Sequence, residues 1–146
     1  MDYLFRHSSD LDHYTAEAFT LRCFDDRFWK AFKNFLKEQG YRYIDPESVA
    51  GGAKILSSPE KESDRDFMLR EIEKSIQLHH TQKVLLFTHY DCGAYGGLDR
   101  FAGDQEKQFT FHQQELEKAK TVVQDAFPEL IVETYFIDKE GVAKMG

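Results

Sequence analysis

Two cysteines and one histidine are the residues of this sequence best suited to bind a metal ion. Cys92 follows His89 by three positions, directly after the apolar run of residues 84–87, and Cys23 ends a second apolar run. Thiolate and imidazole are preferred zinc ligands, and three protein ligands leave one coordination position open. The set indicates an open zinc site. The residues also allow an alternative, in which both cysteines are small buried hydrophobic residues and His89 is a hydrogen-bonded loop residue.

Asp25 and Arg27 come directly after the Cys23 run and are two positions apart, so both can point into the crevice that holds the thiol. An arginine beside a carboxylate keeps the carboxylate ionised and orients it by paired hydrogen bonds. Such a carboxylate can accept a hydrogen bond from a zinc-bound water, so that the remaining lone pair of the water faces the substrate. The alternative is a helix-terminal acid in an exposed ion pair, which is our interpretation of Asp26.

The whole-chain composition fits one globular domain without a nucleic-acid partner. The 146 residues are 41% hydrophobic and carry a net charge of −7, which disfavours binding to nucleic acids or anionic membranes. No apolar window approaches the length of a membrane span. The first residues lack the basic start and apolar core of a signal peptide, so we expect a cytoplasmic protein. Two cysteines in such a chain are more often free thiols or ligands than a disulfide.

Apolar patterning predicts alternating strands and helices. Strands are predicted at residues 19–24 and 41–44, from residue 84 to the His89 turn, and at residues 131–137. Helices are predicted from residue 26 to Gly40, from Ser58 and Pro59 to His79 and His80, and over residues 107–127 with Phe109 facing inward. Pro46 would follow the end of the second strand, and residues 47–58 would form a loop.

This order of elements predicts an α/β fold with a mainly parallel sheet and flanking helices, to which residues 142–145 could add an antiparallel edge strand. Right-handed crossovers place the carboxyl ends of all parallel strands at one edge, where such sheets bind ligands. Cys23 and the His89–Cys92 turn both fall there. We therefore expect one zinc-binding domain over residues 1–146, with residues 1–18 as an N-terminal arm.

Glycines cluster near both halves of the predicted site. Gly51 and Gly52 permit positive φ or a close backbone approach, and a flexible turn is as well favoured as a role in lining the pocket. Gly93 begins the glycine-rich segment that follows the His89–Cys92 turn. We assign these three glycines as candidate substrate-binding residues.

The combined pattern Cys23-x-Asp25-x-Arg27 and His89-x-x-Cys92 resembles the signature of the β-class carbonic anhydrases. The resemblance extends over residues 20–97 by motif and to the end of the chain by the order of elements. It implies that zinc is bound by the two cysteines and the histidine, and that the Asp–Arg dyad orients a zinc-bound hydroxide. It also implies the strand order 2-1-3-4, and homodimers or higher oligomers with active sites near the subunit interface.

The loop around Gly51 is similar to the Asn-Ala-Gly loop of that family, but it departs from it at two positions. Ser48 and Val49 stand where the family usually has a basic residue and an asparagine. The glycine-rich segment after Cys92 also carries the bulky Tyr95, which could narrow the pocket. None of these changes removes a ligand or the dyad.

The resemblance implies a zinc lyase, a carbonic anhydrase that reversibly hydrates carbon dioxide to bicarbonate through a zinc-bound hydroxide. Two alternatives stay open, a non-catalytic zinc-binding regulatory or assembly protein and a zinc hydrolase of a related small substrate such as carbon disulfide. The family also allows Asp25 to take the fourth zinc position at rest, in which case activity would rise with pH. His79, His80 and His112 are conceivable proton shuttles.

Overall fold

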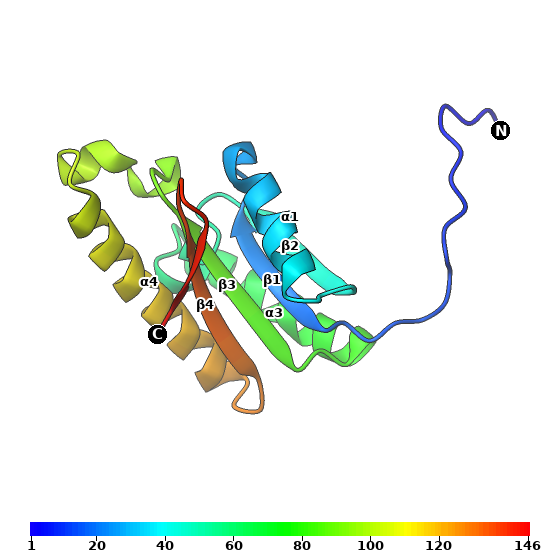
Figure 1. Cartoon of the computed structure of the whole chain (residues 1–146). Coiled ribbons are helices and arrows are strands. Elements are labelled where there is room, and N and C mark those ends of the chain that lie inside the picture. The colour runs from blue at the N-terminus through cyan, green and yellow to red at the C-terminus, as the bar shows by residue number, and fades with distance from the viewer.

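A five-stranded sheet organises the chain (Figure 1). In the computed structural model, which describes residues 1–146, the strand order is β2-β1-β3-β4-β5. The strands are β1 (Ala18–Cys23), β2 (Ile44–Val49), β3 (Lys83–His89), β4 (Ile131–Ile137) and β5 (Val142–Met145). The first four are parallel, and β5 runs antiparallel to β4. The predicted fold class, the order 2-1-3-4 and the antiparallel edge strand are confirmed.

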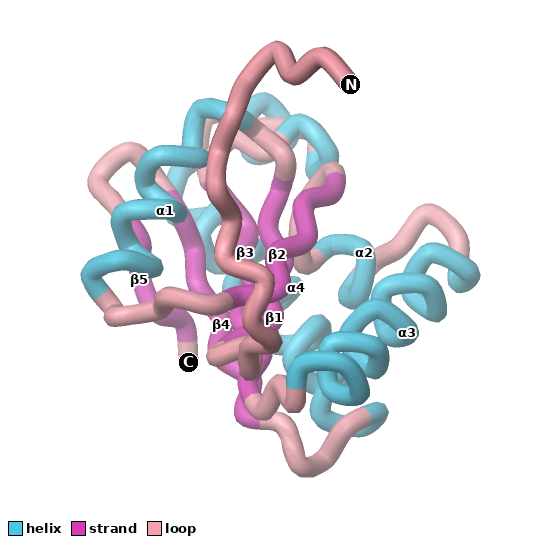
Figure 2. The backbone as a smooth tube through the Cα atoms, turned by 90° about the vertical axis from the view of Figure 1, so that its right-hand side faces the viewer, coloured by secondary structure: helices cyan, strands magenta, loops and turns pink.

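Helices cover both faces of the sheet, with α1 on one face and α3 and α4 on the other (Figures 1 and 2). The helices are α1 (Trp29–Glu38), the short α2 (Lys54–Ser57), α3 (Glu62–His79) and α4 (Gln105–Ala126). None of them is both long and apolar enough to cross a membrane.

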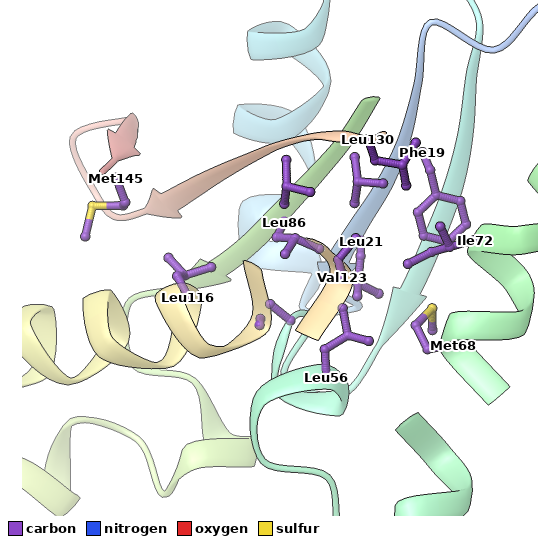
Figure 3. Close-up of a cluster of buried hydrophobic side chains, with 14 of the residues drawn as sticks. Phe19, Leu21, Leu56, Met68, Ile72, Leu86, Leu116, Val123, Leu130 and Met145 are labelled. Atoms are coloured by element: carbon purple, nitrogen blue, oxygen red, sulfur yellow. The ribbon is translucent and has the colours of Figure 1, made fainter. Parts of the chain in front are cut away.

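The larger part of the core lies between the sheet and the α2, α3 and α4 layer (Figure 3). Its fully buried members include Leu21 and Leu86 from strands, and Met68, Ile72, Leu116 and Val123 from helices. On the opposite face, Leu85 and Phe87 pack against Phe32 and Leu36 of α1. Because β3 is buried on both faces, it is apolar without alternation, as central parallel strands are. Its carboxyl end, which carries His89, is therefore held by packing on two sides.

The second strand differs from its predicted position. It begins at Ile44 instead of residue 41, and it runs through Pro46 to Val49 instead of ending before the proline. The prediction of a loop from residue 47 to 58 is also wrong, since that segment contains the end of β2 and the helix α2. β2 is an edge strand that pairs only with β1, so the missing N–H of Pro46 costs the sheet no hydrogen bond.

The starts of three helices also differ. The helix predicted from residue 26 begins with a separate 3-10 turn, Asp26–Phe28, and α1 starts only at Trp29. Ser58 does not begin α3 but ends α2, because its backbone N–H bonds to the carbonyl of Lys54. α3 begins at Glu62 and ends at His79, as predicted, with His80 in a left-handed cap. α4 starts two residues earlier than predicted, where the side chain of Asp104 caps the helix.

The inner face of α4 is more polar than predicted. Phe109 was expected to face inward, but it is 40% exposed, although its ring still contacts Phe136. Gln108, His112 and Glu115 are buried on this helix instead. Their spacing of four and three residues places them on one stripe of the helix. These three residues form the polar stripe of α4, from which Gln108 and Glu115 bond to Asp91 and Tyr95.

The first fifteen residues are exposed and form neither helix nor strand. Figure 1 shows this segment (dark blue) running away from the sheet. Tyr14 contacts the body of the protein, with its ring centroid 4.2 Å from that of His79 and its hydroxyl donating to Asp45. Backbone hydrogen bonds from Ala16 and Glu17 then lead into β1, which begins at Ala18.

Candidate metal centre

The three predicted metal ligands meet at the carboxyl edge of the sheet. Cys23 is the last residue of β1, His89 is the last residue of β3, and Cys92 follows in the next turn. Their ligand atoms all lie within 4.8 Å of one another, and all three side chains are buried. β1 lies between β2 and β3, so the site sits where the strand order reverses, which is the usual ligand position in open α/β sheets.

The hydrogen bonding of His89 fits a metal ligand. Its Nδ1 lies 2.8 Å from the carbonyl oxygen of Tyr90, which can only accept, so the proton is on Nδ1. Nε2 carries the free lone pair and is buried without any hydrogen-bond partner. Buried polar atoms are normally paired, and a metal-binding histidine typically donates its second ring nitrogen to a carbonyl. With two sulfur atoms beside this nitrogen, the donor set fits zinc.

The two thiols shift each other's pKa in opposite directions. A hydrogen bond from Cys92 lowers the pKa of Cys23, and the backbone N–H groups of Asp25 and Gly51 lower it further, against the opposing effect of burial. The same bond and burial raise the pKa of Cys92. One thiolate is therefore already favoured before metal binding, and a bound cation would displace the second proton.

The paired glycines support the Cys23 end of the site. Gly51 donates its N–H to the sulfur of Cys23 at 3.3 Å. Gly52 has a φ of 57°, and a Cβ there would lie 2.7 Å from the backbone nitrogen of Cys23 and would also overlap the carbonyl of Phe87. Both glycines are buried, whereas Gly93 is exposed and has open space around its Cα. Substrate contact by Gly51, Gly52 and Gly93 stays a prediction. The close approach of the backbone explains why glycine stands at positions 51 and 52.

Asp25 and Arg27 form the predicted pair beside the ligands. The Arg27 Nε lies 3.1 Å from each carboxylate oxygen of Asp25, and Nη2 lies 2.7 Å from Oδ2. These hydrogen bonds lower the pKa of Asp25 to about 2, so the carboxylate is ionised at neutral pH. Asp25 Oδ2 lies 3.8 Å from the free Nε2 of His89. The carboxylate is thus adjacent to the position that a metal ion would take.

Sequence reasoning missed Asp91, which contacts this pair, and Gln108, which contacts Asp91. Arg27 Nη1 lies 3.2 Å from Asp91 Oδ2, and Nη2 lies 3.1 Å from the Asp91 carbonyl. Gln108 of α4 accepts a 2.7 Å hydrogen bond from the N–H of Asp91. The position of Asp91 between two ligands was an available signal. Gln108 carried no such signal, because Phe109 and Leu116 share one face of a helix and a polar residue at position 108 lies beside that face.

Tyr95 is buried against the metal-ligand candidates. Its ring is 3% exposed and packs with both cysteines. The hydroxyl donates to Glu115 of α4 at 3.1 Å, and this carboxylate also accepts from Ser57 and Lys118. The turn that carries Cys92 is therefore tied to α4 through Tyr95.

The candidate proton shuttles are not gathered at the ligands. His79 is bonded to Asp45, and His79 and His80 lie at the end of α3, before β3 begins, which is the opposite edge of the sheet. His112 is 1% exposed, neither ring nitrogen has a partner, and burial lowers its pKa to about 4. A buried neutral imidazole has no direct exchange with solvent, so none of the three is marked as a shuttle by its position.

Comparison with known proteins gives one family for nearly the whole chain. The family model described as "Putative carbonic anhydrase" matches residues 14–145. An uncharacterized protein of Rickettsia bellii is 25% identical over 130 residues, which cover 87% of this chain and 79% of that protein.

Solved structures share the fold. A β-carbonic anhydrase of Trichomonas vaginalis has a TM-score of 0.63 at 12% identity, covering 95% of this chain and 87% of that chain. Tetrameric β-carbonic anhydrases of Sordaria macrospora have a TM-score of 0.61 at 16% identity, covering 91% of this chain and 82% of that chain. The apo form of a carbon disulfide hydrolase has a TM-score of 0.55 at 14% identity, covering 88% of this chain and 76% of that chain. With its family model matched over residues 14–145, the chain belongs to the carbonic anhydrase family and has the β-class fold.

Proposed function

We propose that the protein is a zinc-dependent carbonic anhydrase that reversibly hydrates carbon dioxide to bicarbonate and a proton. The observation that carries the proposal is the ionised Asp25, paired with Arg27 and 3.8 Å from the unpartnered Nε2 of His89. A structural zinc site would need no such oriented carboxylate at its fourth position, whereas a hydrating enzyme would.

Cys23, His89 and Cys92 would hold the zinc ion through two sulfur atoms and one nitrogen. When bound, zinc would lower the pKa of a coordinated water to roughly 7 and so supply a nucleophile near neutral pH. The protein's own contribution to the metal is a buried, preformed donor set whose histidine tautomer is already fixed by the Tyr90 carbonyl.

Asp25 would act by accepting a hydrogen bond from the nucleophile, which turns the attacking lone pair toward the substrate. Arg27 keeps the carboxylate ionised and fixes its plane by three contacts. Phe28 packs on the His89 ring with ring centroids 4.6 Å apart, and it supplies an apolar surface beside the dyad for an apolar substrate. The intact Asp25–Arg27 pair supports an open fourth position rather than one occupied by Asp25.

Carbon disulfide is a second candidate substrate. It is linear and apolar like carbon dioxide, and the fold of this chain is similar to that of a carbon disulfide hydrolase.

The non-catalytic alternative rests on Ser48 and Val49, the two positions at which the loop departs from the family pattern. Val49 ends β2 opposite Cys23, and its side chain packs on the main core, so the loop is held by packing at this position.

We further propose that the active protein is a homodimer or a higher homo-oligomer. Phe24 and Trp29, on either side of the dyad in the sequence, are 63% and 39% exposed. Aromatic residues are enriched at protein–protein interfaces relative to the rest of the surface. The tetrameric state of the Sordaria macrospora proteins also supports this proposal. Light scattering on the purified chain would measure its mass in solution, and a monomer at all concentrations would contradict it.

The decisive experiment is stopped-flow carbon dioxide hydration on protein whose zinc content is measured in the same preparation. Zinc near one per chain with turnover above the buffer rate would support the proposal. The same preparation should be given carbon disulfide, with release of hydrogen sulfide as the readout, and turnover there alone would favour the second substrate. A zinc-loaded protein inactive on both substrates at neutral and alkaline pH would favour the non-catalytic alternative.

A further inference from the structure

Arg27 is held by two carboxylates from two different strand ends. Its Nε and Nη2 atoms are engaged with Asp25, which follows β1, and its Nη1 is engaged with Asp91, which follows β3. The Nη2 atom also donates to the carbonyl oxygen of Asp91. All three guanidinium nitrogens thus have acceptors, although the side chain is 55% exposed. An exposed arginine with one partner could rotate together with that partner, but an arginine held from two sides cannot.

Asp91 is itself fixed on three sides. Its N–H donates to the Oε1 of Gln108, a side chain that is 1% exposed. Its Oδ1 accepts the N–H of Leu98 at 2.8 Å, which leaves Oδ2 free to face the arginine. Its backbone has a φ of 54°, a conformation that aspartate and asparagine adopt more readily than most residues. An ideal Cβ on Gly97 would lie 2.9 Å from Oδ1, so a side chain at position 97 would collide with the carboxylate in this position.

We propose that Asp91 is a positioning residue, which holds Arg27 so that the carboxylate of Asp25 stays aimed at the fourth position of the metal site. Asp91 acts through the arginine and has no contact with the substrate. Gln108 anchors the arrangement to α4. The catalytic consequence rests on the proposed function, whereas the restraint on Arg27 does not depend on any substrate.

The test is Asp91→Asn in the full-length, zinc-loaded protein. Asparagine tolerates the positive φ and can still accept from Leu98 through its Oδ1, but it then presents an N–H₂ group to the arginine instead of a carboxylate oxygen. The matched control is Asp99→Asn, which removes the same charge from an exposed position in the following turn, with no side-chain contact in the structure. Three quantities are measured in each variant: zinc content, turnover, and hydrogen exchange at the Arg27 Nε–H group by NMR.

For Asp91→Asn we expect unchanged zinc, loss of the slowly exchanging Arg27 Nε–H signal, and a fall in kcat of about fivefold, the upper range for a partly exposed ion pair. The signal is identified by its absence in Arg27→Lys. Wild-type exchange and turnover in Asp91→Asn would overturn the proposal. If the asparagine variant loses zinc, Asp91→Gly, which fits the positive φ without strain, repeats the test.

Loss of zinc in both variants would also overturn the proposal, because Asp91 would then support the metal turn and not the arginine. The exchange measurement separates this inference from the proposed function. An inactive wild-type protein whose Arg27 signal is protected, and is lost in Asp91→Asn, would refute the carbonic anhydrase activity and leave the positioning contact standing.

Discussion

Asp25→Asn is the substitution that most directly tests the dyad. It keeps the size of the side chain but removes the charge, and with it the charge-assisted contacts to Arg27 at 2.7 and 3.1 Å. The amide could turn its N–H₂ group toward the nucleophile, which then loses its acceptor. Losing an oriented general acid–base partner typically costs about 10²–10⁴-fold in rate, so we expect kcat to fall by about that factor.

The stability of the fold should change far less than the rate. Arg27 is 55% exposed, so its pair with Asp25 contributes at most about 1 kcal/mol, which for a chain of this size shifts the melting temperature by only a few degrees. No zinc ligand is altered. The assay is stopped-flow carbon dioxide hydration beside zinc analysis and thermal unfolding, with Asp26→Asn as the matched control at an exposed neighbour. A folded, zinc-loaded Asp25→Asn protein with wild-type turnover would refute the role of the dyad.

Three other perturbations test the metal site and its support. Removal of zinc by a chelator should leave Cys23 and Cys92 able to form a disulfide in air, since their sulfur atoms lie within 4.8 Å of each other; mass spectrometry that finds both thiols free would contradict this placement. Gly52→Ala should destabilise the protein by at least about 1 kcal/mol in urea unfolding, because the new Cβ overlaps the Phe87 carbonyl and the backbone has positive φ; wild-type stability would contradict the close approach. His112 is neutral in the fold, with its pKa lowered from 6.5 to about 4, so the unfolded chain binds its proton first and stability falls as pH drops through that window. The full effect is about 3 kcal/mol, and His112→Leu should lack it when urea unfolding of the two proteins is compared at pH 7 and pH 4.5; parallel pH profiles would show that His112 has an ordinary pKa.

Much of the sheet and the proximity of the ligands could be predicted because local signals and packing agree there. The run that became β3 is apolar on both faces, and parallel topology brings the ends of β1 and β3 to one edge. The topology then fixes the positions of the three ligand candidates, Cys23, His89 and Cys92. Their clustering follows from topology more than from any one motif.

The errors lie where distant contacts decide the local structure. Pro46 ended the predicted strand, but an edge position removes the penalty on a proline. Ser58 suits a helix start by composition, yet its N–H was already used to end α2. Asp91 and Gln108 were missed because each gains its meaning from the other, across a separation of seventeen residues. No local pattern reveals such a pair.

Hydrogen bonds from the polar stripe of α4 should restrict which residues can replace one another during evolution, both on that helix and in the metal turn. Gln108 meets the backbone of Asp91, and Glu115 meets the hydroxyl of Tyr95. Because Gln108 and Glu115 are buried, an apolar replacement of Gln108 would leave the backbone N–H of Asp91 without this acceptor, and one of Glu115 would remove the acceptor of the Tyr95 hydroxyl. Related sequences that keep the metal turn would therefore be expected to keep hydrogen-bond acceptors at these two helix positions, and their loss would mark sequences in which the turn has changed.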